Sequence, residues 1–290
     1  MTTTTEELVR ARVPFVQATV VRAQHPTSSH AGDTALVRAD GSIEGFVGGT
    51  CAESSVREYG LRALRAGEPL LLRIVPGGTP VGAEPGAVTV ANPCLSGGSM
   101  EIFLEPRLPA PRVVVVGDTP IAHALVALGG PLGFDVSLAE TDPRPDDAAL
   151  VVASHGRGEE PALTAALQAG VPYVALVASR ARGAVVLAAL DVPDELRARV
   201  HSPAGLDLGG GTAAEIALSI LAELVRERRA AARAPVVPPE PDTAVDPVCG
   251  MTVAAVPASV HLDTADGVRW FCCTGCRDTY AADPARYAPA

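Results

Sequence analysis

From Pro111 onwards, the sequence alternates short apolar runs with segments of helical spacing. Four consecutive valines, Val113 to Val116, precede Gly117 and a helical segment that reaches Ala127. The alternation continues with strand-like runs at 134–139, 150–153 and 171–177, and with helices at 161–169 and 213–229. Continuous apolar strands alternating with helices are typical of a parallel sheet covered on both faces. We therefore expect a Rossmann-like domain over residues 109–229.

The N-terminal part predicts an α+β domain over residues 1–108. Residues 13–23 and 34–41 have strand character, and Asp40-Gly41 is a hairpin-turn signal. Residues 51–67 have helical periodicity, and short strands punctuated by glycine end in MEIFLEP. The expected fold class is α/β: this α+β domain, the Rossmann-like parallel-sheet domain and a small C-terminal cysteine-rich module.

Residues 230–244 are rich in proline, so we expect an extended linker there with neither helix nor sheet. The module that follows, residues 245–290, carries Cys249, Cys272 and Cys276 in a C-x22-C-x3-C spacing. Three converging thiolates select Zn, Cu(I) or iron–sulfur species over Mg or Ca. The adjacent Cys273 could be the fourth ligand, although neighbouring residues rarely both reach one metal; His261 or water is the alternative fourth ligand. The alternative, a Cys272–Cys276 disulfide, would be strained or labile in a reducing compartment.

The charge composition excludes several function classes. The chain has a net charge of −10 and every cationic side chain is an arginine, so a lysine Schiff base and a P-loop lysine are excluded. The acidic balance argues against nucleic acid as the main partner. The N-terminal MTTTTEELVR lacks a signal-peptide pattern and no apolar run is long enough to span a membrane, so we expect a cytoplasmic protein. In that compartment the cysteines are expected to be ligands or reactive thiols rather than disulfides.

A first candidate ligand loop is GFVGGTCAES, residues 45–54. Gly48 and Gly49 would let backbone N–H groups approach a ligand closely. Cys51 begins the predicted helix, where the helix dipole favours anions and lowers the pKa of a thiol. Such a loop could hold a phosphate or a soft metal. The alternative is a tight strand-to-helix turn with a buried small cysteine.

A second glycine loop, NPCLSGGSMEIFLEP, repeats the pattern of a cysteine beside a glycine pair. Its candidate residues are Cys94, Ser96, Gly97 and Gly98. The two loops could converge on one ligand, or they could be two separate glycine turns.

The turn at Gly117 follows a strand and opens a helix, as a dinucleotide-binding fold requires. Asp142 lies near the end of the next strand, where a ribose-binding carboxylate would sit. Thr119, however, holds the place of the second fingerprint glycine, which permits close approach of a pyrophosphate. The domain could therefore bind a nucleotide or serve as a scaffold.

Further polar residues follow the later strands of this domain. His155 comes directly after the third strand, at the carboxyl end where parallel sheets bind ligands, and is a candidate site residue or a surface histidine. Ser179, Arg180 and Arg182 follow the next strand and could hold an anion, or the arginines could be solvated.

Taken in order, several segments resemble the XdhC/CoxI family over residues 13–229: ATVVRA, GFVGGTCAESSV, CLSGGSMEIFLEP, VVVVGDTPIA, ASHGRGEE and SPAGLDLGGGTAAEIALSILAEL. The GGTC form looks more like the CoxI branch. The C-terminal DPVCGM, FCCTGC and DPARY segments resemble a YHS (TRASH-like) metal-binding domain.

The resemblance implies a non-enzymatic maturation factor for a molybdenum hydroxylase, such as xanthine or carbon monoxide dehydrogenase. Such a factor binds molybdenum cofactor (molybdopterin or its cytosine dinucleotide), protects it during sulfuration and delivers it to the apoenzyme. The implied partners are that apoenzyme, a cysteine desulfurase and a second copy of the chain. The candidate cofactor-binding residues are Gly48, Gly49, Thr50, Cys51, Glu53, Cys94, Ser96, Gly97, Gly98, Gly117, Asp142 and His155, with Cys249, Cys272 and Cys276 for a Zn, Cu or Fe ion.

Two other functions remain open on the sequence. The Rossmann-like half suggests an NAD(P)-dependent oxidoreductase, although its glycine fingerprint is broken. The C-terminal thiols suggest a soft-metal sensor or carrier.

Overall fold

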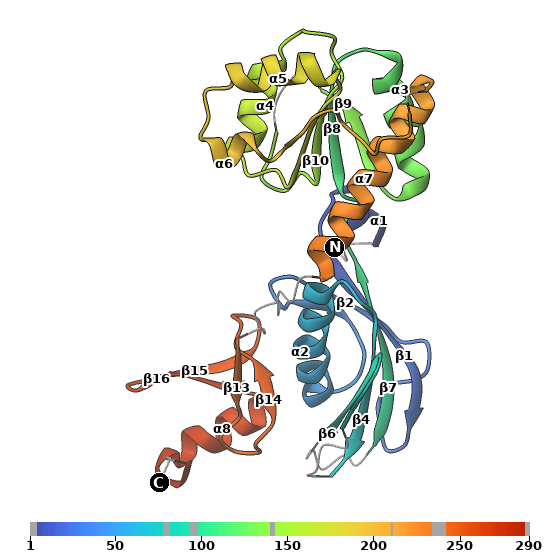
Figure 1. The fold of residues 1–290 in the computed structure, drawn as a ribbon. Coiled ribbons are helices and arrows are strands. Elements are labelled where there is room, and N and C mark those ends of the chain that lie inside the picture. The colour runs from blue at the N-terminus through green and yellow to red at the C-terminus, as the bar shows by residue number, and fades with distance from the viewer. Residues whose placement is uncertain are drawn as a thin grey trace. The chain divides into compact units, whose positions relative to one another are not determined.

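A computed structural model describes residues 5–77, 82–92, 98–139, 143–209, 211–233 and 242–287 (Figure 1). The chain divides into two units. Unit 1 combines Met1–Pro109 with Val237–Ala290, and unit 2 is Ala110–Val236. The first unit is therefore discontinuous in sequence, because the second unit is inserted into it.

The N-terminal part of unit 1 is a seven-stranded mixed sheet with one long helix, which confirms the predicted α+β arrangement. The strand order is β3-β2-β1-β7-β4-β6-β5, and the neighbours are antiparallel except for the parallel pair β4 and β6. The predicted hairpin at Asp40-Gly41 joins β2 to β3. The elements are α1 Thr5–Arg10, β1 Phe15–Gln24, β2 Thr34–Arg38, β3 Ile43–Gly45, α2 Thr50–Ala66, β4 Leu70–Pro76, β5 Gly82–Glu84, β6 Ala87–Asn92 and β7 Ser99–Arg107.

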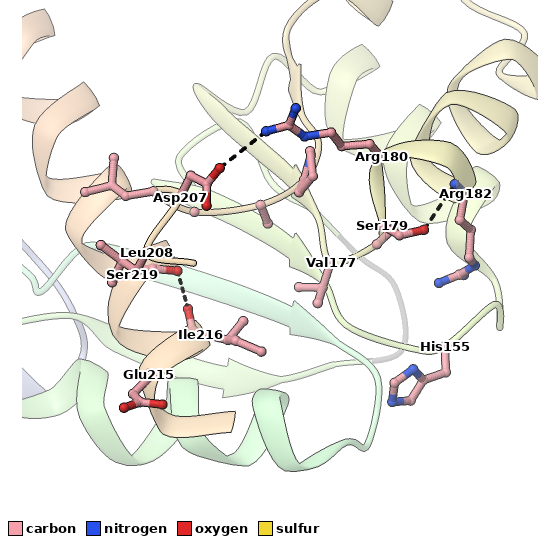
Figure 2. Close-up of a pocket in the computed structure, with 15 residues that line it drawn as sticks. His155, Val177, Ser179, Arg180, Arg182, Asp207, Leu208, Glu215, Ile216 and Ser219 are labelled. Atoms are coloured by element: carbon pink, nitrogen blue, oxygen red, sulfur yellow. Dashed lines mark hydrogen bonds and ion pairs between the residues drawn. The ribbon is translucent and has the colours of Figure 1, made fainter. Parts of the chain in front are cut away.

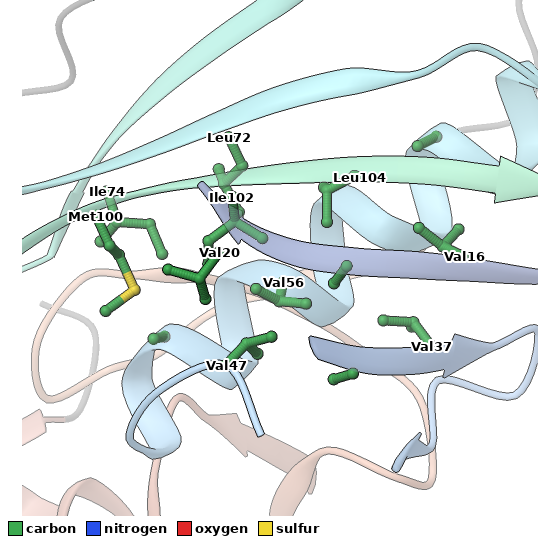
Figure 3. Packing of buried hydrophobic residues seen from close by; sticks show 14 of the residues in the cluster. Val16, Val20, Val37, Val47, Val56, Leu72, Ile74, Met100, Ile102 and Leu104 are labelled. Carbon is green, nitrogen blue, oxygen red and sulfur yellow. The ribbon is translucent and has the colours of Figure 1, made fainter. Parts of the chain in front are cut away.

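The core of this sheet lies between its strands and α2. Burial alternates along β1, as expected for a strand with one face against a core. Val16 and Val20 from β1 meet Ile102 and Leu104 from β7, and Val56 of α2 closes the cluster (Figure 3). This packing fixes α2 on the sheet, and with it the position of the GGTC loop at the start of the helix.

The C-terminal module of unit 1 consists of two small hairpins and a helix. Its two-stranded sheets pair β13 with β14 and β15 with β16. The module contacts the N-terminal part of the unit where β14 packs against α2. Its elements are β13 Thr243–Val245, β14 Thr252–Ala254, β15 Val260–Thr264, β16 Gly267–Phe271, α8 Thr274–Ala282 and the 3-10 helix η2 Pro284–Tyr287.

Unit 2 has a five-stranded, all-parallel sheet in the order β12-β11-β10-β8-β9, which confirms the predicted Rossmann-like domain. Separate hydrophobic clusters cover its two faces, so the four-valine run of β8 is buried from both sides. The elements are β8 Arg112–Val116, α3 Pro120–Gly129, η1 Gly130–Leu132, β9 Asp135–Leu138, β10 Ala149–Val152, α4 Glu159–Gln168, β11 Tyr173–Leu176, α5 Arg180–Ala189, α6 Asp194–Arg197, β12 Val200–His201 and α7 Ala213–Arg233.

The expected linker was wrong at both ends. Helix α7 continues to Arg233, because residues 230–233 are three alanines and an arginine, which favour a helix, and the first proline comes only at Pro235. At the other end, β13 already begins at Thr243 and pairs with β14. No helix among the described residues is long and apolar enough to cross a membrane.

Candidate functional site

The three predicted metal-ligand cysteines come together in the C-terminal module. Cys249 follows β13, Cys272 follows β16, and Cys276 lies in the first turn of α8. The Cys249 and Cys272 Sγ atoms are 3.6 Å apart, and those of Cys272 and Cys276 are 3.7 Å apart. Tetrahedral coordination with Zn–S bonds of about 2.3 Å places sulfur atoms about 3.8 Å apart. The spacing of the thiols therefore fits a soft metal such as Zn.

Asp246 is the fourth polar side chain of this group, and the sequence reasoning missed it. One ligand atom from each of Asp246, Cys249, Cys272 and Cys276 lies within 4.8 Å of the others. Asp246 is fully buried and its carboxylate accepts backbone N–H groups from Val248 at 2.9 Å and Cys272 at 2.8 Å. These bonds hold the Cys249 turn against the end of β16. The Asp-Pro pair in DPVCGM could have indicated this role, because aspartate side chains often accept hydrogen bonds from backbone N–H groups in a turn.

His261, one of the expected fourth ligands, does not belong to this group. Its Nδ1 atom lies 2.8 Å from the carbonyl oxygen of Ser259, and its ring packs on Trp270 with 5.0 Å between ring centroids. The histidine is thus a packing residue of the β15–β16 hairpin.

Cys51 lies against the same thiols. Gly49 is the N-cap of α2 and Cys51 is in its first turn, as the sequence predicted. The Sγ atoms of Cys51, Cys272 and Cys273 form a second group within 4.8 Å of one another. Cys273, which was one candidate for the fourth ligand, thus lies in this group with Cys272 and Cys51 and not in the group of Cys249 and Cys276.

The thiols of the C-terminal module influence one another's protonation. Hydrogen bonds with Cys249 and then Cys51, together with burial, raise the pKa of Cys272. Burial and then repulsion from the Asp246 carboxylate raise the pKa of Cys276. The hydrogen bond from Cys272 lowers the pKa of Cys249.

The other predicted residues of the two glycine loops differ in how far they are buried and in whether the structure describes them. Thr50 begins α2 and is exposed, whereas Glu53 is partly buried in the same first turn and Gly48 is buried. Gly98 approaches the backbone so closely that an added Cβ would lie 2.8 Å from the Pro26 carbonyl carbon. The remaining candidates of the second loop, Cys94, Ser96 and Gly97, lie outside the described residues, so its convergence with Cys51 stays a prediction.

In unit 2 a pocket lies outside the carboxyl ends of β8 and β10, where the strand order reverses. Gly117, Thr119 and His155 line it, while Asp142 lies outside the described residues. The Thr119 hydroxyl accepts the Ala122 N–H at 3.2 Å and donates to the Ala153 carbonyl at 2.9 Å. Thr119 is therefore the N-cap of α3, which explains why the second fingerprint glycine is replaced.

His155 also lines a neighbouring pocket with the predicted anion-binding residues (Figure 2). Arg182 forms an ion pair with the buried Glu159, and Arg180 lies 3.3 Å from Asp207. The Ser179 hydroxyl accepts the Arg182 N–H as the N-cap of α5. The buried partner of Arg182 favours a structural role for this arginine, whereas Arg180 and Asp207 are both exposed, as expected for a solvated loop arginine.

Comparison with known proteins gives matches in both units. Residues 8–75 match the XdhC and CoxI family, and residues 113–224 match the XdhC Rossmann domain. The uncharacterized protein YqeB of Escherichia coli (strain K12) is 30% identical over 252 residues, a match that covers 76% of this chain and 44% of YqeB. The chain thus spans less than half the length of this relative.

A crystal structure from Bacillus halodurans, titled a xanthine dehydrogenase, overlaps with a TM-score of 0.40 at 16% identity, over 81% of this chain and 96% of the other. An overlap of this quality supports no conclusion about activity. The two family matches, taken together, place the chain in the XdhC and CoxI family, with an XdhC Rossmann domain.

Proposed function

We propose that this protein binds molybdenum cofactor as cargo and delivers it, after sulfuration, to a xanthine or carbon monoxide dehydrogenase-type hydroxylase. The family is associated with the maturation of molybdenum hydroxylases. In this role the chain is a carrier rather than an enzyme. Its partners would be the apoenzyme and a cysteine desulfurase, with a homodimer as the working assembly.

The observation that carries the proposal is the position of Cys51 in the first turn of α2, directly after Gly48 and Gly49. Molybdenum cofactor presents phosphate oxygens, two dithiolene sulfurs and a soft metal. The free N–H groups at a helix N-terminus suit the phosphate, and a thiolate suits the metal or its sulfur. The loop therefore offers both kinds of group within a few residues.

The test is to replace Cys51 by serine and to measure the cofactor that the protein retains. Protein from cells supplied with molybdate would be passed through gel filtration and analysed for molybdenum and pterin. We expect Cys51→Ser to retain about tenfold less cofactor, the change that follows from 1.4 kcal/mol of lost binding energy. The matched control is Ala66→Ser, an exposed substitution at the far end of the same helix. Equal retention by both variants would remove Cys51 as a direct ligand.

A further inference from the structure

Five cysteines of the described chain converge in unit 1, and they form two groups that share one member. The first group holds Cys249, Cys272 and Cys276 beside Asp246. The second holds Cys51, Cys272 and Cys273. Cys51 comes from the N-terminal helix α2, whereas all the other members come from the C-terminal module. Cys272 is thus placed between two sets of thiols from opposite ends of the sequence.

The contact around Cys51 is a packed one. Cys51 lies against a small hydrophobic cluster formed by Met251, Val253 and Cys272, all of which are buried. A second contact joins the same two parts at the β2–β3 turn, where a Cβ added to Gly41 would lie 2.7 Å from Val256 Cγ2. The position of Cys51 beside the module's thiols therefore depends on an apolar interface as well as on the thiols themselves.

We propose that Cys51, Cys272 and Cys273 bind a second soft-metal ion, which the Cys272 thiolate bridges to a first ion held by Cys249, Cys272 and Cys276. Sulfur ligands select soft cations such as Cu(I), Zn(II) or Cd(II) over hard ones. Each thiol releases its proton as its sulfur binds the metal, so no oxidant or reductant is needed. The metal centre would then link the N-terminal domain directly to the C-terminal module.

Metal binding at this centre would compete with the cargo, because the proposed function uses the same Cys51 sulfur. A soft ion bound to Cys51 would occupy the thiol and hold the C-terminal module over the GGTC loop. This consequence rests on the proposed function, but the metal site itself does not. A metal count made without cofactor therefore tests the site even where the cargo assignment fails.

The experiment is a titration of the reduced full-length protein with Cd(II), chosen because each bound thiolate adds ultraviolet charge-transfer absorption. Bound Cd(II) would also be counted by elemental analysis after dialysis. We expect two ions per chain for the wild type and one for Cys51→Ser, with loss of the absorption that Cys51 and Cys273 contribute as ligands of the second ion. Cys273→Ser is the matched variant from the other side of the site and is expected to lose the same ion.

Ala66→Ser controls for substitution within α2 and is expected to keep both ions. Trp270, the only tryptophan, reports whether the C-terminal module of each variant is folded, through its fluorescence in the metal-free protein. A folded Cys51→Ser variant that still binds as many ions as the wild type would overturn the proposal. So would a wild-type protein that binds fewer than two ions.

Discussion

Gly117 is a predicted cofactor-binding residue, yet the structure gives it a backbone role that can be tested without any ligand. Its φ is +121°, in a region that side chains rarely adopt. A Cβ at this position would lie 2.7 Å from both the Ala153 carbonyl carbon and the Ser154 Cα. We predict that Gly117→Ala displaces the end of β10 and strongly destabilises unit 2.

The magnitude follows from two effects. An unfavourable backbone conformation costs about 1–3 kcal/mol, and forcing an extra carbon into a filled space costs about 1–3 kcal/mol more. Gly133 offers a matched control in the same unit, because its φ is also positive, at +80°, and an added Cβ would meet no atom within 4 Å. Gly133→Ala should therefore carry only the backbone cost, about 1–2 kcal/mol.

The assay is amide hydrogen exchange of peptides from β8 and β10, measured where exchange follows the opening equilibrium. A difference of about 2 kcal/mol between the variants corresponds to about thirtyfold faster exchange in Gly117→Ala than in Gly133→Ala. Equal loss of protection in the two variants would refute the argument from close backbone approach.

Two further predictions concern buried carboxylates. Burial alone would raise the pKa of Glu223, but hydrogen bonds from Tyr173 and other groups outweigh it and hold the pKa below the ordinary value of a glutamate. Because the pKa of Glu223 is lower in the folded than in the unfolded state, its stabilisation is present above about pH 4.5 and is lost as the pH falls through the folded-state pKa. Glu223→Gln should therefore weaken the loss of stability at low pH, measured by hydrogen exchange. The same variant should lower the free energy of unfolding at pH 7 by about 1–3 kcal/mol. Asp246→Asn places an amide group against the Cys272 N–H, so the free energy of unfolding of the C-terminal module should fall by about 1–3 kcal/mol. The measurement is a denaturant titration followed by Trp270 fluorescence. An unchanged midpoint would contradict the role given to Asp246.

Local patterns predicted most of the secondary structure. The four-valine strand, the helix that begins near Cys51 and the parallel sheet of unit 2 all follow from periodicity that neighbouring residues supply. The elements α5, α6 and β12 were not predicted. Segments as short as α6 and β12 show little periodicity of their own, and α5 buries only Gly183 and Val186, so it lacks a clear apolar face. The parallel pairing of β4 with β6 depends on contacts across the sheet, which no local pattern contains.

The candidate site was predictable only in parts. The spacing of Cys249, Cys272 and Cys276 was sufficient to predict that these thiols lie together, because only short strands and turns separate them in the sequence. The approach of Cys51 to Cys272 was not predictable, because it depends on packing between segments separated by the whole of unit 2. Asp246 was missed because aspartate before proline is a common turn residue, and only the structure shows its burial beside the thiols.

The insertion of unit 2 into unit 1 has a consequence for the order of events during synthesis. The ribosome finishes the N-terminal sheet first, but the module that packs beside Cys51 emerges only after the whole inserted unit has been made. At about 5–20 residues per second, this delay lasts roughly 10–40 s. Throughout that interval the nascent chain presents Cys51 without its C-terminal thiol neighbours. A reagent that modifies thiols would therefore reach Cys51 most easily before translation ends.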